Sequence, residues 1–90
     1  MYKIIYTESY VKRAKIFAQK HPELLNQYKK TLLLLELNPS HPSLRLHKLE
    51  GRFSDYYSVS INMTYRITID LLIKEKEIIP LNVGKHEEVY

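Results

Sequence analysis

Residues 56–83 decide the fold, and they read YYSVSINMTYRITIDLLIKEKEIIPLNV. Three segments in this stretch are rich in β-branched and aromatic residues with partial alternation, which is typical of strands: Tyr56–Ile61, Tyr65–Ile73 and Ile78–Val83. Residues 62–64 and 74–77 have the length of hairpin connections. The stretch therefore predicts three consecutive antiparallel strands.

Two helices and a further strand are predicted before this stretch. Residues 2–6 form a short strand, and Thr7 or Ser9 caps a first helix. A second helix starts at Pro22 and runs to about Glu36. Apolar residues recur at helical spacing in both, at Val11, Ala14, Phe17 and Ala18 and then at Leu24, Leu25, Tyr28, Leu32 and Leu35. The order β-α-α-β-β-β predicts an α+β domain, residues 1–90, with both helices packed on a mainly antiparallel four-stranded sheet.

Composition restricts the class of protein further. The chain has no cysteine, which excludes disulfides and cysteine-based zinc sites, and its histidines show no recognised metal-ligand spacing. We therefore expect neither a metal nor a cofactor. No run approaches the roughly 18 apolar residues of a membrane span, and a signal peptide is not evident, so we expect a cytoplasmic protein. The net charge of +4 favours polyanionic partners.

Three segments in the second half of the chain carry a family resemblance. Residues 46–52 read LHKLEGR, residues 57–67 hold Tyr57-Ser-Val and Tyr65-Arg-Ile, and residues 83–90 read VGKHEEVY. In this order and spacing they resemble the RelE/ParE superfamily of toxins from type II toxin–antitoxin systems. The resemblance is closest to RelE/YafQ-like mRNA interferases, and the predicted architecture extends it over the whole chain.

The resemblance implies a ribosome-dependent, metal-independent endoribonuclease that cleaves mRNA and inhibits translation. Its partners would be mRNA, the ribosome and a cognate antitoxin, with the toxin either monomeric or in a heteromeric complex. In the implied reaction a ribose 2′-hydroxyl attacks the adjacent phosphate. Two alternatives remain open: a non-catalytic DNA gyrase inhibitor of the ParE type, and an inactive scaffold with the same fold.

This reaction requires a base, an acid and a cation that stabilises the phosphorane. His86 is the main catalytic candidate, since imidazole titrates near neutral pH and YafQ- and YoeB-type members carry a histidine near this end. His47 is a second acid–base or phosphate-positioning candidate. Arg66 is expected to bind phosphate with its planar guanidinium, although a strand arginine paired with Asp70 or Glu50 is the structural alternative.

Further side chains are candidates for binding the RNA rather than for proton transfer. Lys48, Arg45 and Lys85 are expected to contact phosphates, while Tyr90 and Tyr65 are expected to stack on bases. Alternation, however, places Tyr65 on the face of the strand opposite Arg66. YafQ-type members carry another histidine and an acid where residues 58–64 here read SVSINMT, which leaves the identity of the base open.

Overall fold

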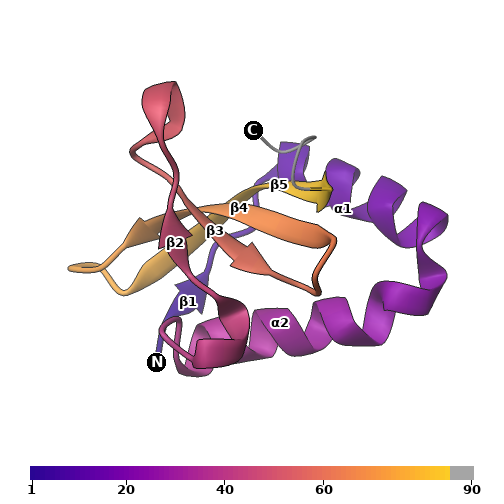
Figure 1. The fold of residues 1–90 in the computed structure, drawn as a ribbon, viewed down its shortest axis with the longest axis horizontal. Helices are drawn as coiled ribbons and strands as arrows, with labels where there is room; N and C mark the ends of the chain where they lie inside the picture. The colour runs from indigo at the N-terminus through magenta and orange to yellow at the C-terminus, as the bar shows by residue number, and fades with distance from the viewer. Residues whose placement is uncertain (86–90) are drawn as a thin grey trace.

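The computed structural model describes residues 1–85, which form a five-stranded sheet with two α-helices (Figure 1). The strands lie in the order β1-β5-β4-β3-β2. Their bounds are β1 Lys3–Ile4, β2 His47–Lys48, β3 Tyr57–Ser60, β4 Tyr65–Leu72 and β5 Glu77–Lys85. Strand β1 runs parallel to β5, and the other neighbouring strands are antiparallel. The α+β class and the three consecutive antiparallel strands are confirmed.

The sheet has one strand more than the four predicted. In β2, His47 pairs with Ser58 and Lys48 pairs with Tyr57, where the sequence indicated only a polar connector. Both β2 residues are exposed. A two-residue strand with no buried position has no alternation that the sequence pattern could reveal.

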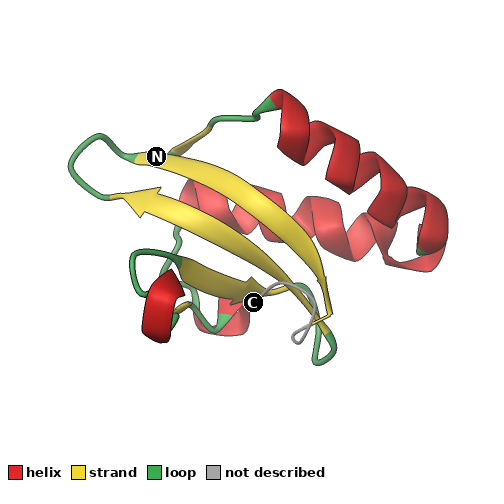
Figure 2. Ribbon diagram, turned by 90° about the horizontal axis from the view of Figure 1, so that it is seen from above, coloured by secondary structure: helices red, strands yellow, loops and turns green. Residues whose placement is uncertain are grey.

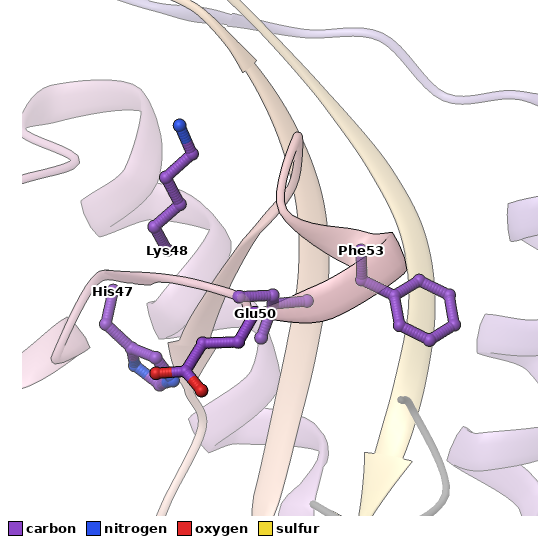
Figure 3. A pocket seen from close by; sticks show the side chains of 5 residues that line it. His47, Lys48, Glu50 and Phe53 are labelled. Atoms are coloured by element: carbon purple, nitrogen blue, oxygen red, sulfur yellow. The ribbon is translucent and has the colours of Figure 1, made fainter.

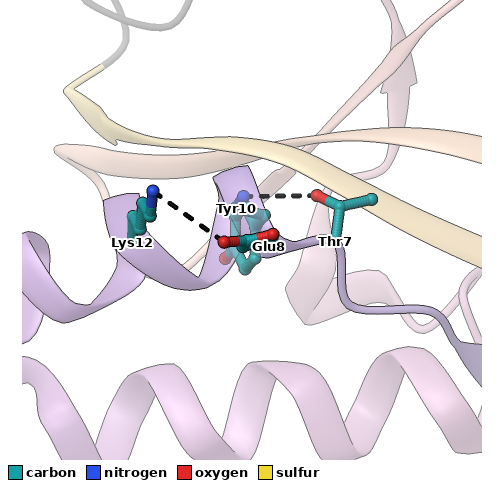
Figure 4. Close-up of polar contacts among 4 residues, drawn as sticks. All are labelled: Thr7, Glu8, Tyr10 and Lys12. Atoms are coloured by element: carbon teal, nitrogen blue, oxygen red, sulfur yellow. Dashed lines mark hydrogen bonds and ion pairs between the residues drawn. The ribbon is translucent and has the colours of Figure 1, made fainter.

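The helices begin where local capping chemistry allows it. Helix α1 (Glu8–Lys20) starts after Thr7, whose Oγ1 accepts a hydrogen bond from the Tyr10 backbone N–H at 3.2 Å (Figure 4). Pro22 opens a 3-10 turn, η1 (Pro22–Leu24), so α2 (Leu25–Leu37) begins three residues later than predicted. Two more 3-10 turns follow, η2 (Pro42–Leu44) and η3 (Gly51–Phe53).

Both helices cover one face of the sheet, and the core lies between these two layers (Figure 2). Fully buried aliphatic residues from α2 and from the central strands meet there: Leu35, Val59, Ile67, Ile69 and Ile78. None of the helices in residues 1–85 is long and apolar enough to cross a membrane. The core therefore occupies one side of the sheet and leaves the other side available for polar residues.

A buried tyrosine pair joins the two helices. The hydroxyls of Tyr10 in α1 and Tyr28 in α2 lie 2.7 Å apart, and the Tyr10 side chain is fully buried. Burial, reinforced by the neighbouring Tyr28, raises the pKa of the Tyr10 phenol well above its ordinary value of 10.0. Burial also raises the pKa of Tyr28, against the opposing effect of the Tyr10 hydrogen bond.

We expect this pair to make the protein sensitive to alkali. Above about pH 10 the unfolded chain ionises its tyrosines while the folded chain keeps Tyr10 protonated, so the unfolded state is favoured as pH rises. Each such tyrosine lowers the free energy of unfolding by about 1.4 kcal/mol per pH unit in this range, and by nothing below it. Urea titrations between pH 8 and 11 measure the slope. A slope that is unchanged in Tyr10→Phe would contradict this account.

Candidate functional site

The face of the sheet opposite the helices carries hydroxyls and a guanidinium. Val59 and Ile67 are register partners, are fully buried, and belong to the core on the helix side. Because neighbouring side chains in a strand point to opposite faces, Ser58, Ser60 and Arg66 lie on the outer face. Ser60 pairs with Arg66 across the β3–β4 ladder, so their side chains start next to each other.

His47 shares this outer face. It pairs with Ser58, which in turn pairs with Thr68 in β4, and directly paired residues of neighbouring strands project to the same face. Strand β3 lies between β2, which carries His47, and β4. Measured along the strands, the His47–Ser58 pair is two residues from the Ser60–Arg66 pair. Standard strand spacing then separates the Cα atoms of His47 and Arg66 by roughly 12 Å. Two side chains of this length can approach one nucleotide from opposite sides.

Arg66 is half-buried, and two of its three guanidinium nitrogens lack a partner among residues 1–85. Its Nε and Nη1 atoms are shielded from solvent and make no hydrogen bond there, and the same holds for the Oγ atoms of Ser58 and Ser60. No ion pair joins Arg66 to Asp70 or Glu50 within the described chain. A buried cation without compensation is costly, and an anion that accepts hydrogen bonds from these groups would offset that cost. The cluster is therefore suited to bind a phosphate.

The serines are the functional candidates that the sequence reasoning missed. A serine hydroxyl does not titrate near neutral pH, so a pattern of acids and bases does not include it. A usable signal was present, since Ser58 and Ser60 flank Val59 in a strand where aliphatic residues are the usual choice. Both side chains are almost fully buried, which is unusual for serine.

The hydrogen bonding of His47 leaves its other ring nitrogen basic. Its Nδ1 lies 3.1 Å from the Arg45 carbonyl oxygen, and a carbonyl can only accept. Nδ1 therefore carries the hydrogen, and in the neutral ring Nε2 keeps a free lone pair. His47 is exposed, so this nitrogen is accessible to a bound molecule.

His47 also lines a hollow of about 420 Å³ with Lys48, Leu49, Glu50 and Phe53 (Figure 3). In Figure 3 the side chains of His47 and Glu50 extend to the same side of the chain, whereas Lys48 points the other way. Lys48 pairs with Tyr57, which packs against the core, so its side chain starts on the helix side of the sheet. The structure therefore does not bring Lys48 together with Arg66.

Arg45 lies at the border of the outer face. Its backbone has a left-handed conformation, with φ of 48°, at the end of η2. Its Nη1 donates to Sδ of Met63 at 3.0 Å. Arg45 and Ser60 line one hollow of about 320 Å³ at the end of the β3–β4 hairpin. Ser60, the register partner of Arg66, is the one residue of the polar cluster that lines this hollow.

The other predicted residues lie elsewhere. The ring of Tyr65 packs on the helix side against Phe17 and His21, at centroid distances of 5.5 and 4.7 Å, and so lies away from Arg66. Lys85 is exposed at the end of β5. His86 and Tyr90 lie outside the described residues. Within residues 1–85, no three potential ligands among His, Cys, Asp and Glu gather to hold a metal.

Comparison with known proteins gives structural matches only. No protein-family model matches the sequence, and no curated protein matches it. YafQ from E. coli strain BL21(DE3) superposes with a TM-score of 0.80 at 21% identity, covering 100% of this chain and 99% of YafQ. YafQ in the E. coli DinJ–YafQ toxin–antitoxin complex gives 0.77 at 23% identity, covering 99% and 97%.

A more distant match belongs to the same structural group. The YoeB/ParE toxin from Agrobacterium tumefaciens superposes with a TM-score of 0.73 at 14% identity, covering 93% of this chain and 98% of that toxin. These matches span almost the full length of both chains, so the similarity includes both helices and the sheet. The chain therefore has the fold of the RelE/YafQ-like toxins.

Proposed function

We propose that this chain is the toxin of a type II toxin–antitoxin system and an endoribonuclease that cleaves mRNA on the ribosome. The observation that supports the proposal is that Nε and Nη1 of Arg66 and the hydroxyls of Ser58 and Ser60 are shielded from solvent and make no hydrogen bond within residues 1–85. The fold shared with YafQ supports it, and so does the basic net charge of +4. A protein that acts on mRNA and ribosomes would work in the cytoplasm.

The proposed reaction needs no metal ion. The ribose 2′-oxygen forms a bond to phosphorus while the bond from phosphorus to the 5′-oxygen breaks, giving a 2′,3′-cyclic phosphate and a 5′-hydroxyl. A base takes the 2′-hydroxyl proton, and an acid delivers a proton to the leaving oxygen. His47, through Nε2, and His86 share these two roles. Arg66 binds the non-bridging oxygens and stabilises the charge that develops on the phosphorane.

Other residues would bind the flanking RNA. Arg45 would contact the next phosphate, a role supported by the hollow that it lines together with Ser60. Lys85 would contact a phosphate from the end of β5, and Tyr90 would stack on a base. Lys48 would have to reach RNA from the helix side of the sheet, so we expect it to contribute less.

A cognate antitoxin is the proposed protein partner. YafQ and YoeB both occur in solved structures as complexes with antitoxins, DinJ and YefM. In this chain the four consecutive leucines at 32–35 in α2 would provide an apolar contact for the antitoxin. Leu33 is 56% exposed and therefore accessible to a partner, whereas Leu35 is fully buried in the core. Hydrogen exchange with and without the antitoxin tests this idea, and an absence of protection along α2 would contradict it.

Two assays run in parallel distinguish the proposal from its alternatives. A cell-free translation reaction followed by primer extension should reveal cuts in translated mRNA, and the same protein should leave gyrase supercoiling unchanged. Inhibition of gyrase with intact mRNA would support a non-catalytic, ParE-type toxin. Normal growth on strong induction without antitoxin, with neither effect in vitro, would support an inactive scaffold.

Removing either imidazole should slow cleavage. We expect His86→Ala and His47→Ala each to lower the cleavage rate at least tenfold, because proton transfer by a positioned side chain typically contributes 10²–10⁴-fold. Rates are measured by primer extension on a single translated message. His41→Asn is the matched control. It removes an imidazole whose Nδ1 bonds the Ser43 hydroxyl at 2.8 Å and keeps an acceptor for that bond. Full activity in both alanine variants would reject this assignment.

A further inference from the structure

A second hollow lies on the helix side of the sheet, where α1 ends beside β5. It measures about 180 Å³. Three aromatic rings and two cationic side chains form most of its lining, Phe17, His21, Tyr65, Arg13 and Lys20, and the ends of β4 and β5 complete it. We call it the aromatic hollow. None of these five residues has a role in the proposed cleavage chemistry.

The rings of the aromatic hollow hold one another in place. His21 lies 4.7 Å from Tyr65 and 5.0 Å from Phe17, measured between ring centroids, and Phe17 meets Tyr65 edge-on at 5.5 Å. Nδ1 of His21 is also 3.6 Å from a Glu23 carboxylate oxygen. Phe17 is buried, whereas His21 and Tyr65 are only half-buried. Two rigidly placed rings therefore remain accessible to a flat ligand.

The charge around the aromatic hollow is positive. Arg13 and Lys20 are exposed, and neither forms an ion pair within residues 1–85. No acidic residue of the described chain lines the hollow, and the nearby Glu23 is paired with His21. Free cations beside accessible rings are the combination that binds a base together with its phosphates.

We propose that the aromatic hollow binds one unstacked nucleobase of single-stranded RNA, with Arg13 and Lys20 contacting the phosphates on either side. Its volume is below the roughly 300 Å³ at which pockets for drug-sized ligands begin, which suits a single base. The inference rests on the proposed function only in taking RNA as the ligand. It adds a binding site on the face of the sheet opposite Arg66.

The geometry allows one RNA strand to reach both sites. Gly84 pairs with Arg66 and also lines the aromatic hollow. Within residues 1–85, strand β1 pairs with Glu77 and Ile78 of β5 and so lies away from Gly84. RNA that leaves the polar cluster around Arg66 can therefore pass the end of β5 and place a flanking base against Tyr65.

Fluorescence of 2-aminopurine tests the proposal. An RNA hexamer carrying this base, with 2′-O-methyl groups to prevent cleavage, is titrated with protein at low salt. Stacking against Tyr65 and His21 should quench the fluorescence. Tyr65→Leu should remove most of the quenching and weaken binding about tenfold, as expected for the loss of one stacked base. The logarithm of the binding constant falls linearly with the logarithm of the salt concentration, and we call the steepness of this line the salt slope. Arg13→Gln/Lys20→Gln should reduce the salt slope by roughly 1.4, because the variant no longer neutralises two of the RNA phosphates.

Matched variants make the test specific. Lys74→Gln/Lys76→Gln removes the same charge from the β4–β5 turn and should leave quenching unchanged. The arginine–lysine double variant changes only exposed side chains, so it remains informative if Tyr65→Leu unfolds. Absence of quenching in the wild-type protein would overturn the proposal, as would equal salt slopes for the two double variants. Equally tight binding of AMP would assign the hollow to free nucleotides instead.

Base binding in the aromatic hollow can be tested independently of the proposed nuclease activity. Arg66→Gln should lose cleavage yet keep the quenching that depends on Tyr65, because the two residues serve different faces. Quenching without mRNA cleavage in the wild-type protein would support the aromatic hollow and reject the nuclease. Cleavage without quenching would support the nuclease and reject base binding in the aromatic hollow. Variants that weaken only antitoxin binding would identify the hollow as a protein-docking site and overturn the RNA assignment.

Discussion

Arg66→Gln is expected to cleave translated mRNA at least tenfold more slowly than the wild-type protein and to unfold at the same temperature or higher. The rate falls because a fixed guanidinium that stabilises a developing charge is lost, and losing one such donor in other enzymes costs about 10²–10³-fold. Stability is retained because the Nε and Nη1 atoms of Arg66 bond nothing within residues 1–85, so no described partner is orphaned.

Primer extension and thermal unfolding on the same preparations check both halves of this expectation. Arg52→Gln is a charge-matched control, since Arg52 is exposed and lies over the Phe53 ring at 5.0 Å. It should cleave at the wild-type rate. A large loss of stability in Arg66→Gln would show that Arg66 is structural, and unchanged cleavage would remove it from the site.

Leu35→Ala is expected to lower the free energy of unfolding by about 3 kcal/mol, measured by urea denaturation. Leu35 is fully buried between α2 and the sheet, and truncating such a leucine leaves a cavity that typically costs 2–5 kcal/mol. A chain of this size has a total stability of roughly 5–10 kcal/mol, so the loss would be a large share of it.

Leu33→Ala is the matched control on the same helix. Leu33 is 56% exposed, and its truncation should change the free energy of unfolding by less than about 0.5 kcal/mol. Similar losses for both variants would mean that the helix-side core is not organised as described. A large loss at Leu33 alone would require the opposite face of α2 to be buried.

The sequence predicted those elements of the fold that have a repeating hydrophobic pattern. Strands β3, β4 and β5 and both helices each bury one face, and burial produces the periodicity from which they were predicted. Strand β2 was missed because its two residues are exposed. Tyr10 was not predicted as a core residue, because a tyrosine can be buried only when its hydroxyl finds a partner, and Tyr28 lies 18 residues away.

The candidate site was predictable only in part. Arg66 was predicted as a phosphate ligand from the family resemblance and from its planar guanidinium, and this role stays a prediction. The alternation that separates it from Tyr65 is confirmed, because the Tyr65 ring packs on the helix side. Ser58 and Ser60, whose hydroxyls make no hydrogen bond within residues 1–85, became relevant only once the register placed Ser60 beside Arg66. The aromatic hollow joins residues from α1 and β4, which no local sequence pattern connects.

The binding of mRNA phosphate by Arg66 can be tested by a cryo-electron microscopy structure of the protein on a translating ribosome, with 2′-O-methyl mRNA to prevent cleavage. We expect a phosphodiester within hydrogen-bonding distance of the Arg66 guanidinium, with Ser58 and Ser60 facing the same phosphate. An mRNA strand that bypasses the outer face of the sheet, leaving Arg66 without a phosphate, would contradict it.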